Sequence, residues 1–413
     1  MKRQLLLSLL VTLTAPACAD TIDEKPESAP ASLLDPPPLG SGLQFRMVTQ
    51  LDPGIETERC QFFQVPPEGM HVKRSVTRFS TGSHHVLLFG TPYTEIPTAN
   101  RHGDAVDGSG VFECAEGAAA DWQVTGILAG AQSARGANVI DLPDGVAVHL
   151  LPGQVVLMNA HYLNASNDTL DVDARINVES VPAESVREEA GVLFFYNPFI
   201  HVPPTGRASA RMSCPILHDI TLLNGQSHMH RRGTGYEAVL RDAQGAPVKT
   251  LYTGDRWEDV RIELFSPPVQ IPPGHSIDYR CDYQNTEARD VFQGLTTRDE
   301  MCMFVGAYYP RDPSVELCGI PGMKQTYIGT GSASCAQTLA CMDHATTGTD
   351  RQKCVVASCP GSSKAITDFV GCTLDALGSC ADACADLLSA SCTSCTKEVC
   401  GAEVTACEAT SCN

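Results

Sequence analysis

Residues 220–232 read ITLLNGQSHMHRR, and this stretch decides how the central part of the chain folds. Its first half, Ile220–Asn224, is β-prone and favours an extended strand. His228 and His230 follow two positions apart, so on a strand both imidazoles project from one face. On a helix the same spacing would turn them apart by about 200°, and they could not share an ion. The pattern predicts a strand that presents two metal-ligating side chains, with an exposed polar strand end as the alternative interpretation.

The composition suits globular β-rich domains. Of the 413 residues, 43% are apolar and 19% are charged, and the length allows two or three domains with their own cores. The formal net charge is −19, and the sequence has no run of Lys or Arg. This balance argues against nucleic acid and against anionic membrane surfaces as partners.

The N-terminus predicts export. Two basic residues precede an apolar run that is too short to span a bilayer, so residues 1–18 resemble a signal peptide. Small residues before Cys18 fit lipoprotein processing, in which a lipid on Cys18 would attach the protein to a membrane. Ordinary cleavage after Ala17 or Ala19 is the alternative. The proline-rich residues 19–42 predict an extended tether. The expected location is periplasmic, on the cell surface as a lipoprotein, or secreted.

Residues 43–183 predict an all-β sandwich. Short apolar runs are punctuated by proline and glycine, and no segment keeps a helical period of 3.6 residues. The runs 146–151 and 155–158 flank Pro152-Gly153, which favours a β-hairpin.

Three histidines of this first block also form a pattern. His84 and His85 are adjacent in SHHVLLFG, and adjacent residues on a regular strand face opposite sides. Joint ligation by these two therefore requires a bulge at the start of the strand. Further along, strand alternation places His161 beside Asn159 at a strand end. Taken singly, each histidine is also consistent with an ordinary polar residue.

Residues 184–325 predict a second β-rich block. The run 191–196, GVLFFY, is typical of a buried strand. Near the end of the block, Met301 and Met303 lie two positions apart and would share one face of a strand. Packing in the core is the usual role of methionine, so a ligand role for either one needs further support.

The nineteen cysteines imply disulfides, because an exported chain meets an oxidising environment. Cys60 and Cys114 are the two cysteines of the first block, and we expect them to pair. Four cysteines in the second block predict two further bridges: Cys214, Cys281, Cys302 and Cys318.

Residues 330–413 predict a small, disulfide-rich and partly helical module. Twelve cysteines lie here among small residues, with few large apolar side chains. Such a segment cannot bury enough apolar area alone, so we expect six disulfides and short cross-linked helices. Cys392 and Cys395 also have the spacing of a zinc knuckle or redox pair, which the even cysteine count disfavours. We expect this module to serve as a surface-attachment or spacer module.

Taken together, the motifs resemble the copper type II ascorbate-dependent monooxygenases, the family of peptidylglycine α-hydroxylating monooxygenase and dopamine β-monooxygenase. The ordered set is His-His before Val-Leu-Leu-Phe-Gly, then Asn-Ala-His-Tyr, then His-Met-His, then Asp-Glu-Met-Cys ahead of Tyr-Tyr-Pro. The resemblance spans roughly residues 45–320, which includes both β blocks and excludes the tether and the tail.

The resemblance implies an all-β fold of two tandem antiparallel jelly-roll-like sandwiches, each carrying one copper ion across a wet cleft. It implies hydroxylation of an activated C–H bond with O2 and with ascorbate or another one-electron reductant. Imidazole suits both oxidation states of copper, and a thioether favours Cu(I). The implied ligands are His84, His85 and His161 for an electron-transfer copper, and the catalytic set His228, His230 and Met301 for an oxygen-activating copper. The implied disulfides of the second block are Cys281–Cys302 and Cys214–Cys318.

Departures from the family pattern bear on the substrate. Gln226 stands where peptide-hydroxylating members have an arginine that binds a C-terminal carboxylate. Met303 and Val305 replace two polar residues of the family, and Asn159 replaces a glutamine. These changes disfavour a peptide substrate with a C-terminal glycine and favour an apolar or aromatic small molecule.

Two other functions fit the same residues. One is a copper-binding surface protein of the same fold without turnover, and the other is a recognition module without metal. Reductant-dependent oxygen uptake separates the enzyme from the copper-binding protein, and metal content separates both from the recognition module.

Overall fold

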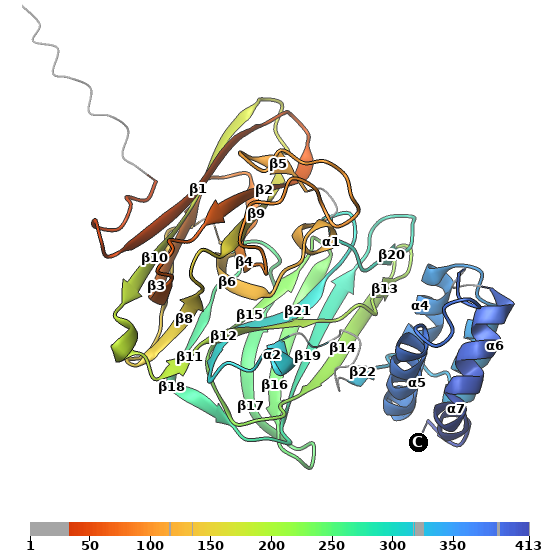
Figure 1. Cartoon of the computed structure of the whole chain (residues 1–413). Helices are drawn as coiled ribbons and strands as arrows, with labels where there is room; N and C mark the ends of the chain where they lie inside the picture. Colours follow the sequence, from red (N-terminus) through yellow and green to blue (C-terminus); the bar gives the residue numbers. More distant parts are fainter. Residues whose placement is uncertain are drawn as a thin grey trace, which may run out of the picture. The chain divides into compact units, whose positions relative to one another are not determined.

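The computed structural model describes residues 33–114, 117–133, 135–316, 318, 326–385 and 389–412. Within these ranges most ordered elements are β-strands, and the longer helices follow residue 334 (Figure 1). The expected signal peptide, Cys18 and the first part of the expected tether lie outside the described residues. None of the described helices combines the length and the apolar character that a membrane span requires.

Two sheets form the first part of the described chain. The first has the order β1 (Gly42–Leu51), β10 (Leu170–Val181), β3 (Met70–Phe79), β8 (Val146–Leu150) and β11 (Glu188–Glu189), with β7 (Asn138–Asp141) also paired to β3. The second has the order β5 (Phe112–Glu113), β2 (Glu56–Gln64), β9 (Val155–Leu163), β4 (Ser83–Gly90) and β6 (Gly126–Ala131). Strand pairing is antiparallel except between β8 and β11.

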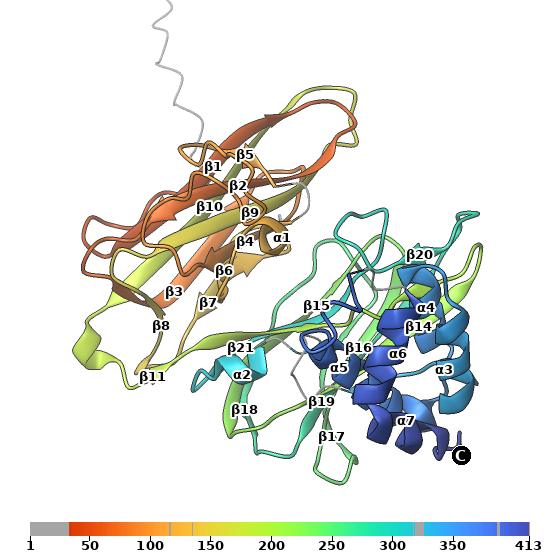
Figure 2. The ribbon, with the colours of Figure 1, turned by 45° about the vertical axis from the view of Figure 1, so that its right-hand side comes forward.

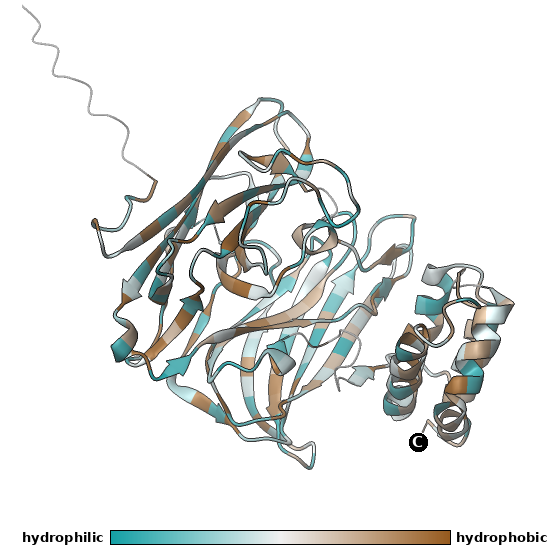
Figure 3. Ribbon diagram, in the orientation of Figure 1, coloured by the Kyte–Doolittle hydropathy of each residue, from teal (hydrophilic) through white to brown (hydrophobic). Residues whose placement is uncertain are grey.

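The core between these sheets follows from the alternation of side chains along each strand. On β10, Ile176 and its alternate neighbours point inward, and on β9, Met158 and its alternate neighbours point toward the same core. The other face of β9, with Leu157, packs on Trp122 and the Cys60–Cys114 disulfide in a smaller cluster. Figure 3 shows the resulting mixture of apolar and polar residues along the strands.

The prediction of a hairpin across Pro152-Gly153 is wrong. β8 pairs with β3 in the first sheet, whereas β9 pairs with β2 and β4 in the second. Leu150 and Val156 nevertheless contribute to one core. The turn therefore carries the chain across the core from one sheet to the other. Side-chain alternation showed which residues are buried, but it carries no information about which strand is the partner.

Two further sheets form the second part. One has the order β12 (Gly191–Tyr196), β21 (Cys302–Tyr309), β15 (Ile220–Met229) and β18 (Glu263–Ile271). The other has the order β17 (Pro247–Gly254), β16 (Gly233–Arg241), β19 (Ser276–Gln284), β14 (Arg207–Pro215) and β22 (Thr326–Ile328). A short pair, β13 (His201–Val202) and β20 (Val291–Phe292), lies apart from both. The expected buried strand 191–196 is β12, at the edge of its sheet.

Helices are short in the β part and longer in the C-terminal part, where they gather into one group (Figure 2). The short ones are α1 (Ala118–Asp121), α2 (Pro313–Glu316), and the 3-10 turns Ala183–Ser185 and Pro360–Ser362. The C-terminal helices are α3 (Cys335–His344), α4 (Gly348–Val356), α5 (Ser363–Ala376), α6 (Ala390–Val399) and α7 (Gly401–Glu408).

Within the described residues, nine disulfides join all eighteen cysteines. In the β part they are Cys60–Cys114, Cys214–Cys318 and Cys281–Cys302. In the helical part they are Cys335–Cys407, Cys341–Cys354, Cys359–Cys412, Cys372–Cys400, Cys380–Cys395 and Cys384–Cys392. The six bridges expected in this part are present, and they leave Cys392 and Cys395 without the free thiols that a zinc knuckle requires. Extensive disulfide bonding fits an extracellular or secreted protein.

The helical part shares one hydrophobic core with the second pair of sheets. Phe369 of α5 belongs to the same buried cluster as Phe195 and Tyr279 of the sheets. The backbone N–H of Tyr327, on β22, donates to Thr367 Oγ1 over 3.0 Å. The helices therefore contribute to the packing of the second β block.

We predict that Phe369→Ala lowers the free energy of unfolding by about 3–5 kcal/mol, because it leaves a cavity in this shared core. Leu374→Ala is the matched control: Leu374 lies on the same helix but is 42% exposed, against 4% for Phe369. It should change stability by about 0.5 kcal/mol or less. Urea titration, followed by Trp257 fluorescence and far-ultraviolet circular dichroism, should show one shifted transition. Loss of helix at a lower urea concentration than the Trp257 change would contradict the shared core.

Candidate metal centre

Two neighbouring strands bring three histidines of the first β block together. The register between β4 and β9 shifts between Ser83 and His85, which is the bulge that the sequence predicts. Because of this shift, both His84 and His85 turn toward His161, and His85 pairs directly with His161 in the ladder. One ring nitrogen from each of the three lies within 4.8 Å of the others. All three side chains are buried.

The second block supplies the His-Met-His motif and Met301. His228 lies near the end of β15, His230 lies just beyond it, and Met229 packs into the core on the opposite side. The carboxylate of Glu300 accepts hydrogen bonds from the backbone N–H groups of His230, at 3.1 Å, and Arg232, at 2.8 Å. Since Met301 follows Glu300, this carboxylate joins the two segments that carry the second predicted ligand set.

The two predicted ligand sets lie side by side. The ring centroid of His84 is 5.3 Å from that of His228 and 5.9 Å from that of His230. A ring nitrogen of His84 also lies within 4.8 Å of one from each of these two, so His84 belongs to both candidate metal groups. The resemblance implied two sites separated by a wet cleft. The structure instead shows one buried cluster of five imidazoles.

Two side chains that the sequence did not single out hold the two β blocks together at this cluster. The amide of Gln132 accepts from His228 Nδ1 at 2.5 Å and donates to the Ser227 carbonyl at 3.0 Å. The carboxylate of Glu56 accepts from His161 Nε2 at 3.0 Å and from the backbone N–H of Thr297 at 2.6 Å. No local motif marks either residue, because each partner is about a hundred or more positions away in sequence.

These hydrogen bonds determine which ring nitrogens remain available. His161 donates from Nε2 and His228 from Nδ1, while Nδ1 of His230 faces the Asp299 carbonyl at 3.3 Å. Within this cluster, four buried ring nitrogens have no hydrogen-bond partner: His84 Nε2, His85 Nδ1, His161 Nδ1 and His230 Nε2. Imidazoles oriented through one nitrogen, with the other unpartnered, are the usual arrangement around a bound metal.

The electrostatics favour the neutral form of four of these imidazoles, those of His84, His85, His228 and His230. Burial, followed by repulsion from neighbouring histidines, holds the pKa values of His84, His85 and His230 well below 6.5. The same causes lower the pKa of His228 to about 3. Burial raises the pKa of Glu56, but hydrogen bonds from His161 and Thr297 outweigh it and bring that pKa to about 2. Neutral imidazoles beside a carboxylate fit a transition-metal cation such as copper.

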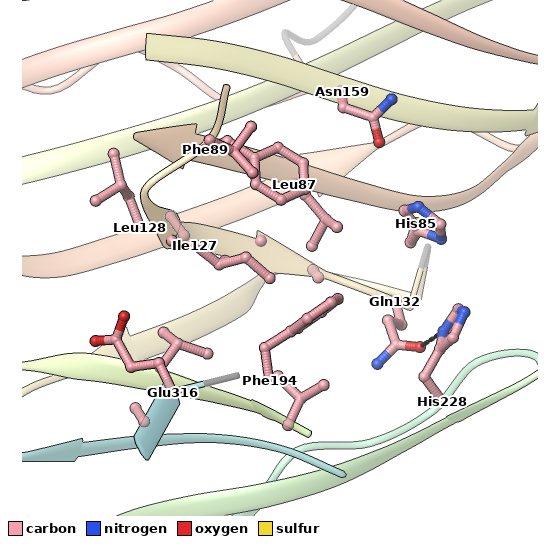
Figure 4. Close-up of a pocket in the computed structure, with 18 of the residues that line it drawn as sticks. His85, Leu87, Phe89, Ile127, Leu128, Gln132, Asn159, Phe194, His228 and Glu316 are labelled. Atoms are coloured by element: carbon pink, nitrogen blue, oxygen red, sulfur yellow. Dashed lines mark hydrogen bonds between the residues drawn. The ribbon is translucent and has the colours of Figure 1, made fainter. Parts of the chain in front are cut away.

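An apolar cavity of about 530 Å³ opens beside the cluster. Figure 4 shows His85 and His228 at one end of it and Glu316 at the other, with Phe194 and Ile127 between them. Both expected methionines line this cavity, and Met303 lies directly opposite His228 in the ladder between β15 and β21. The wall also includes Gln226, Val305 and Asn159, the residues that depart from the family pattern.

Comparison with known proteins supports the family resemblance. A family model described as "Copper type II ascorbate-dependent monooxygenase, C-terminal domain" matches residues 189–329. A Homo sapiens protein named as DBH-like monooxygenase protein 2 is 24% identical over 292 residues, which cover 64% of this chain and 56% of the human protein. Both matches support the resemblance of the chain to the copper type II ascorbate-dependent monooxygenases, and the match to the family model lies in the second β block. The chain spans little more than half the length of this curated monooxygenase relative.

Solved structures add little to this assignment. The alignment with the STIV MCP covers 64% of this chain and 97% of that protein, with 11% identity and a TM-score of 0.30. The alignment with PNGase F, a glycosylasparaginase from Flavobacterium meningosepticum, covers 65% of this chain and 94% of that protein, with 10% identity and a TM-score of 0.28. Scores at this level carry no argument about fold or function.

We predict that the metal-free protein loses stability as the pH falls from 6.5 toward 3. Unfolded histidines bind protons below pH 6.5, whereas folded His228 stays neutral down to about pH 3, so acid favours the unfolded chain. Thermal denaturation across this range should show a smaller pH dependence for His228→Gln than for the wild type. His102→Gln, at an exposed histidine, is the control and should keep the wild-type slope. Equal slopes for wild type and His228→Gln would contradict the buried neutral state.

We also predict that Gln132→Leu weakens copper binding about 10–100-fold, because His228 loses the group that orients its ring. The change should appear in competition titrations with a copper chelator and in the electron paramagnetic resonance spectrum of the Cu(II) form. Gln123→Leu, at an exposed glutamine of the same β block, is the matched control and should bind copper normally. Wild-type affinity and an unchanged spectrum for Gln132→Leu would show that this contact does not orient His228.

Proposed function

We propose that this protein is an exported dicopper monooxygenase that hydroxylates an activated C–H bond of an apolar small molecule, using O2 and an external one-electron reductant such as ascorbate. The observation that carries the proposal is the cluster of five buried imidazoles, four with an unpartnered ring nitrogen, beside an apolar cavity. In the proposed fold, each pair of sheets is a jelly-roll-like sandwich that contributes one ligand set. Export, and a lipid on Cys18, are parts of the same proposal.

We assign the ligands by block. His84, His85 and His161 would hold the electron-transfer copper, and His228, His230 and Met301 the oxygen-activating copper. Bound copper would supply the redox chemistry, cycling between Cu(I) and Cu(II), with the thioether favouring Cu(I). Met301 is preferred over Met303 because it follows Glu300, whose carboxylate binds the His230 backbone directly.

The protein's own residues would orient the ligands and exclude water. Gln132 and Glu56 fix the rings of His228 and His161 from one side, which presents a nitrogen lone pair on the other. The burial of all five imidazoles keeps bulk water away from the centre. Apolar walls bring the substrate to the same point without a charged partner.

One observation favours a second candidate function. Because His84 belongs to both candidate metal groups, the cluster can also be divided as a single mixed site of His84, His228 and His230. A protein that held one copper ion in this way would bind copper without the electron relay that turnover requires. This alternative is a copper-binding surface protein of the same fold.

The test is Met301→Ile compared with Met303→Ile in copper-loaded protein. Loss of the thioether should reduce reductant-dependent oxygen uptake to background in Met301→Ile, while the copper held by His84, His85 and His161 stays bound and reducible. Met303→Ile should retain turnover, because it changes only the cavity wall. Oxygen consumption, metal analysis and Cu(II) spectroscopy give the three readouts.

Either of two results would contradict the assignment. Full turnover in Met301→Ile would remove Met301 as a ligand. Absence of oxygen uptake in the wild-type, copper-loaded protein, across a screen of alcohols, amines and fatty-acyl glycines, would favour the copper-binding alternative. Copper near zero in protein purified without chelator would exclude both.

A further inference from the structure

Two histidines outside the buried cluster face each other on neighbouring strands of the first sheet. His71 on β3 and His149 on β8 are directly opposite in the antiparallel ladder. Their ring centroids are 4.5 Å apart and their planes differ by only 15°, so the two imidazoles are stacked. No motif of the sequence connects these residues, because the pairing of β3 with β8 joins segments that are distant along the chain.

The pair lies on the face of this sheet that is turned away from the core. The next pair along the ladder, Val72 and Val148, points the other way and contributes to the core between the two sheets. Since successive side chains alternate along a strand, His71 and His149 point outward. Both are partly exposed. An ion can therefore reach them from solvent without entering the core.

The other partly or fully exposed histidines with a polar partner have different surroundings. His102, His201 and His218 each have a carboxylate oxygen near a ring nitrogen, at 3.7, 2.7 and 3.1 Å. A carboxylate partner favours the protonated ring, which has no lone pair left for a metal ion. In the described part of the chain, neither His71 nor His149 has a hydrogen-bond partner for its ring.

The environment of the pair favours neutral rings. Burial, followed by repulsion from His149, lowers the pKa of His71, and the charge of Glu189 opposes this change. Lys73 lies two residues after His71 on β3, and Asp144 and Asp141 compensate its charge at 2.9 and 3.8 Å. The ring nitrogens are thus available at neutral pH, with a carboxylate close enough to favour a cation.

The separation of the rings fits a single ion. Metal–nitrogen bonds of about 2.0–2.1 Å place two imidazole nitrogens that share an ion at most about 4.2 Å apart. The distance of 4.5 Å between the centroids of the stacked rings is close to this value. Small rotations of the two side chains would close the difference.

We propose that His71 and His149 form a surface site that binds one transition-metal ion through two imidazole nitrogens, with water completing the coordination. The ligands select ions that favour imidazole, such as Ni(II), Zn(II) and Cu(II), and Cu(II) should bind most tightly. The site is separate from the cluster of five imidazoles and does not depend on the proposed function.

The first experiment is isothermal titration of Cu(II) into the full, metal-free chain. Wild type should bind one more equivalent than His71→Gln or His149→Gln, or hold that equivalent at least about tenfold more tightly, since each variant lacks one of the two ligands. His218→Gln, at an exposed histidine of the second block, is the matched control and should bind as wild type. The expected difference is the same whatever number of ions the buried cluster holds, so it stands or fails separately from the dicopper proposal.

The second experiment needs no variant. Diethylpyrocarbonate modifies imidazoles that have a free ring nitrogen, and mass spectrometry locates each modified histidine. Zn(II) should slow the modification of both His71 and His149 in the wild type under single-hit conditions. The exposed His344 on α3 is the control and should react at the same rate with and without Zn(II).

Three results would overturn the proposal. One is equal stoichiometry and affinity for Cu(II) in the wild type and both variants. Another is loss of the equivalent in only one variant, which would show contact with a single histidine and no shared ion. The third is modification of His71 and His149 at rates that Zn(II) does not change. Loss in both variants, with far-ultraviolet circular dichroism like that of the wild type, would support the shared site.

Discussion

The burial of five imidazoles in one cluster is the constraint on which the rest of the structure depends. A buried polar atom without a partner costs about 1–3 kcal/mol, and four such ring nitrogens meet here. A charged imidazole would be still less favourable in the same place. The rest of the fold must therefore contribute enough favourable free energy to offset the cost of burying these side chains. A bound cation that accepts several lone pairs at once would remove that penalty, which supports the proposed metal site.

Hydrogen bonds between the two β blocks hold the side chains of this cluster in place. Gln132 of the first block holds His228 of the second, and Glu56 of the first holds both His161 and the loop that leads to Met301. Ser133 adds a hydrogen bond to Asp259 at 2.6 Å. A change in the spacing of the blocks would alter both ligand sets together. The apolar cavity is lined by the same two blocks, so ligand binding and ligand geometry depend on a single arrangement.

The sequence predicted the features that are local or periodic. The strand that carries His228, the bulge at His84, the mostly β fold and the six bridges of the C-terminal part follow from alternation, turn residues and cysteine number. It failed where a partner is distant in sequence. The runs around Pro152 belong to different sheets, Gln132 and Glu56 carry no motif, and the proximity of His84 to His228 depends on how the blocks pack. The family resemblance supplied the proposed ligands but implied a wider separation between the two sets.

The nine disulfides would narrow the choice of electron donor for the proposed reaction. Six of them hold helices whose apolar side chains complete the core of the second β block, so their reduction would weaken the part of the protein that carries His228 and Met301. A thiol donor supplies electrons, but it also exchanges with disulfides. This exchange would break the bridges that stabilise the protein to which the thiol donates electrons. A donor that passes single electrons and forms no mixed disulfide avoids this conflict. The covalent framework would thus restrict which reductants are compatible with the proposed reaction, at a distance from the metal centre itself.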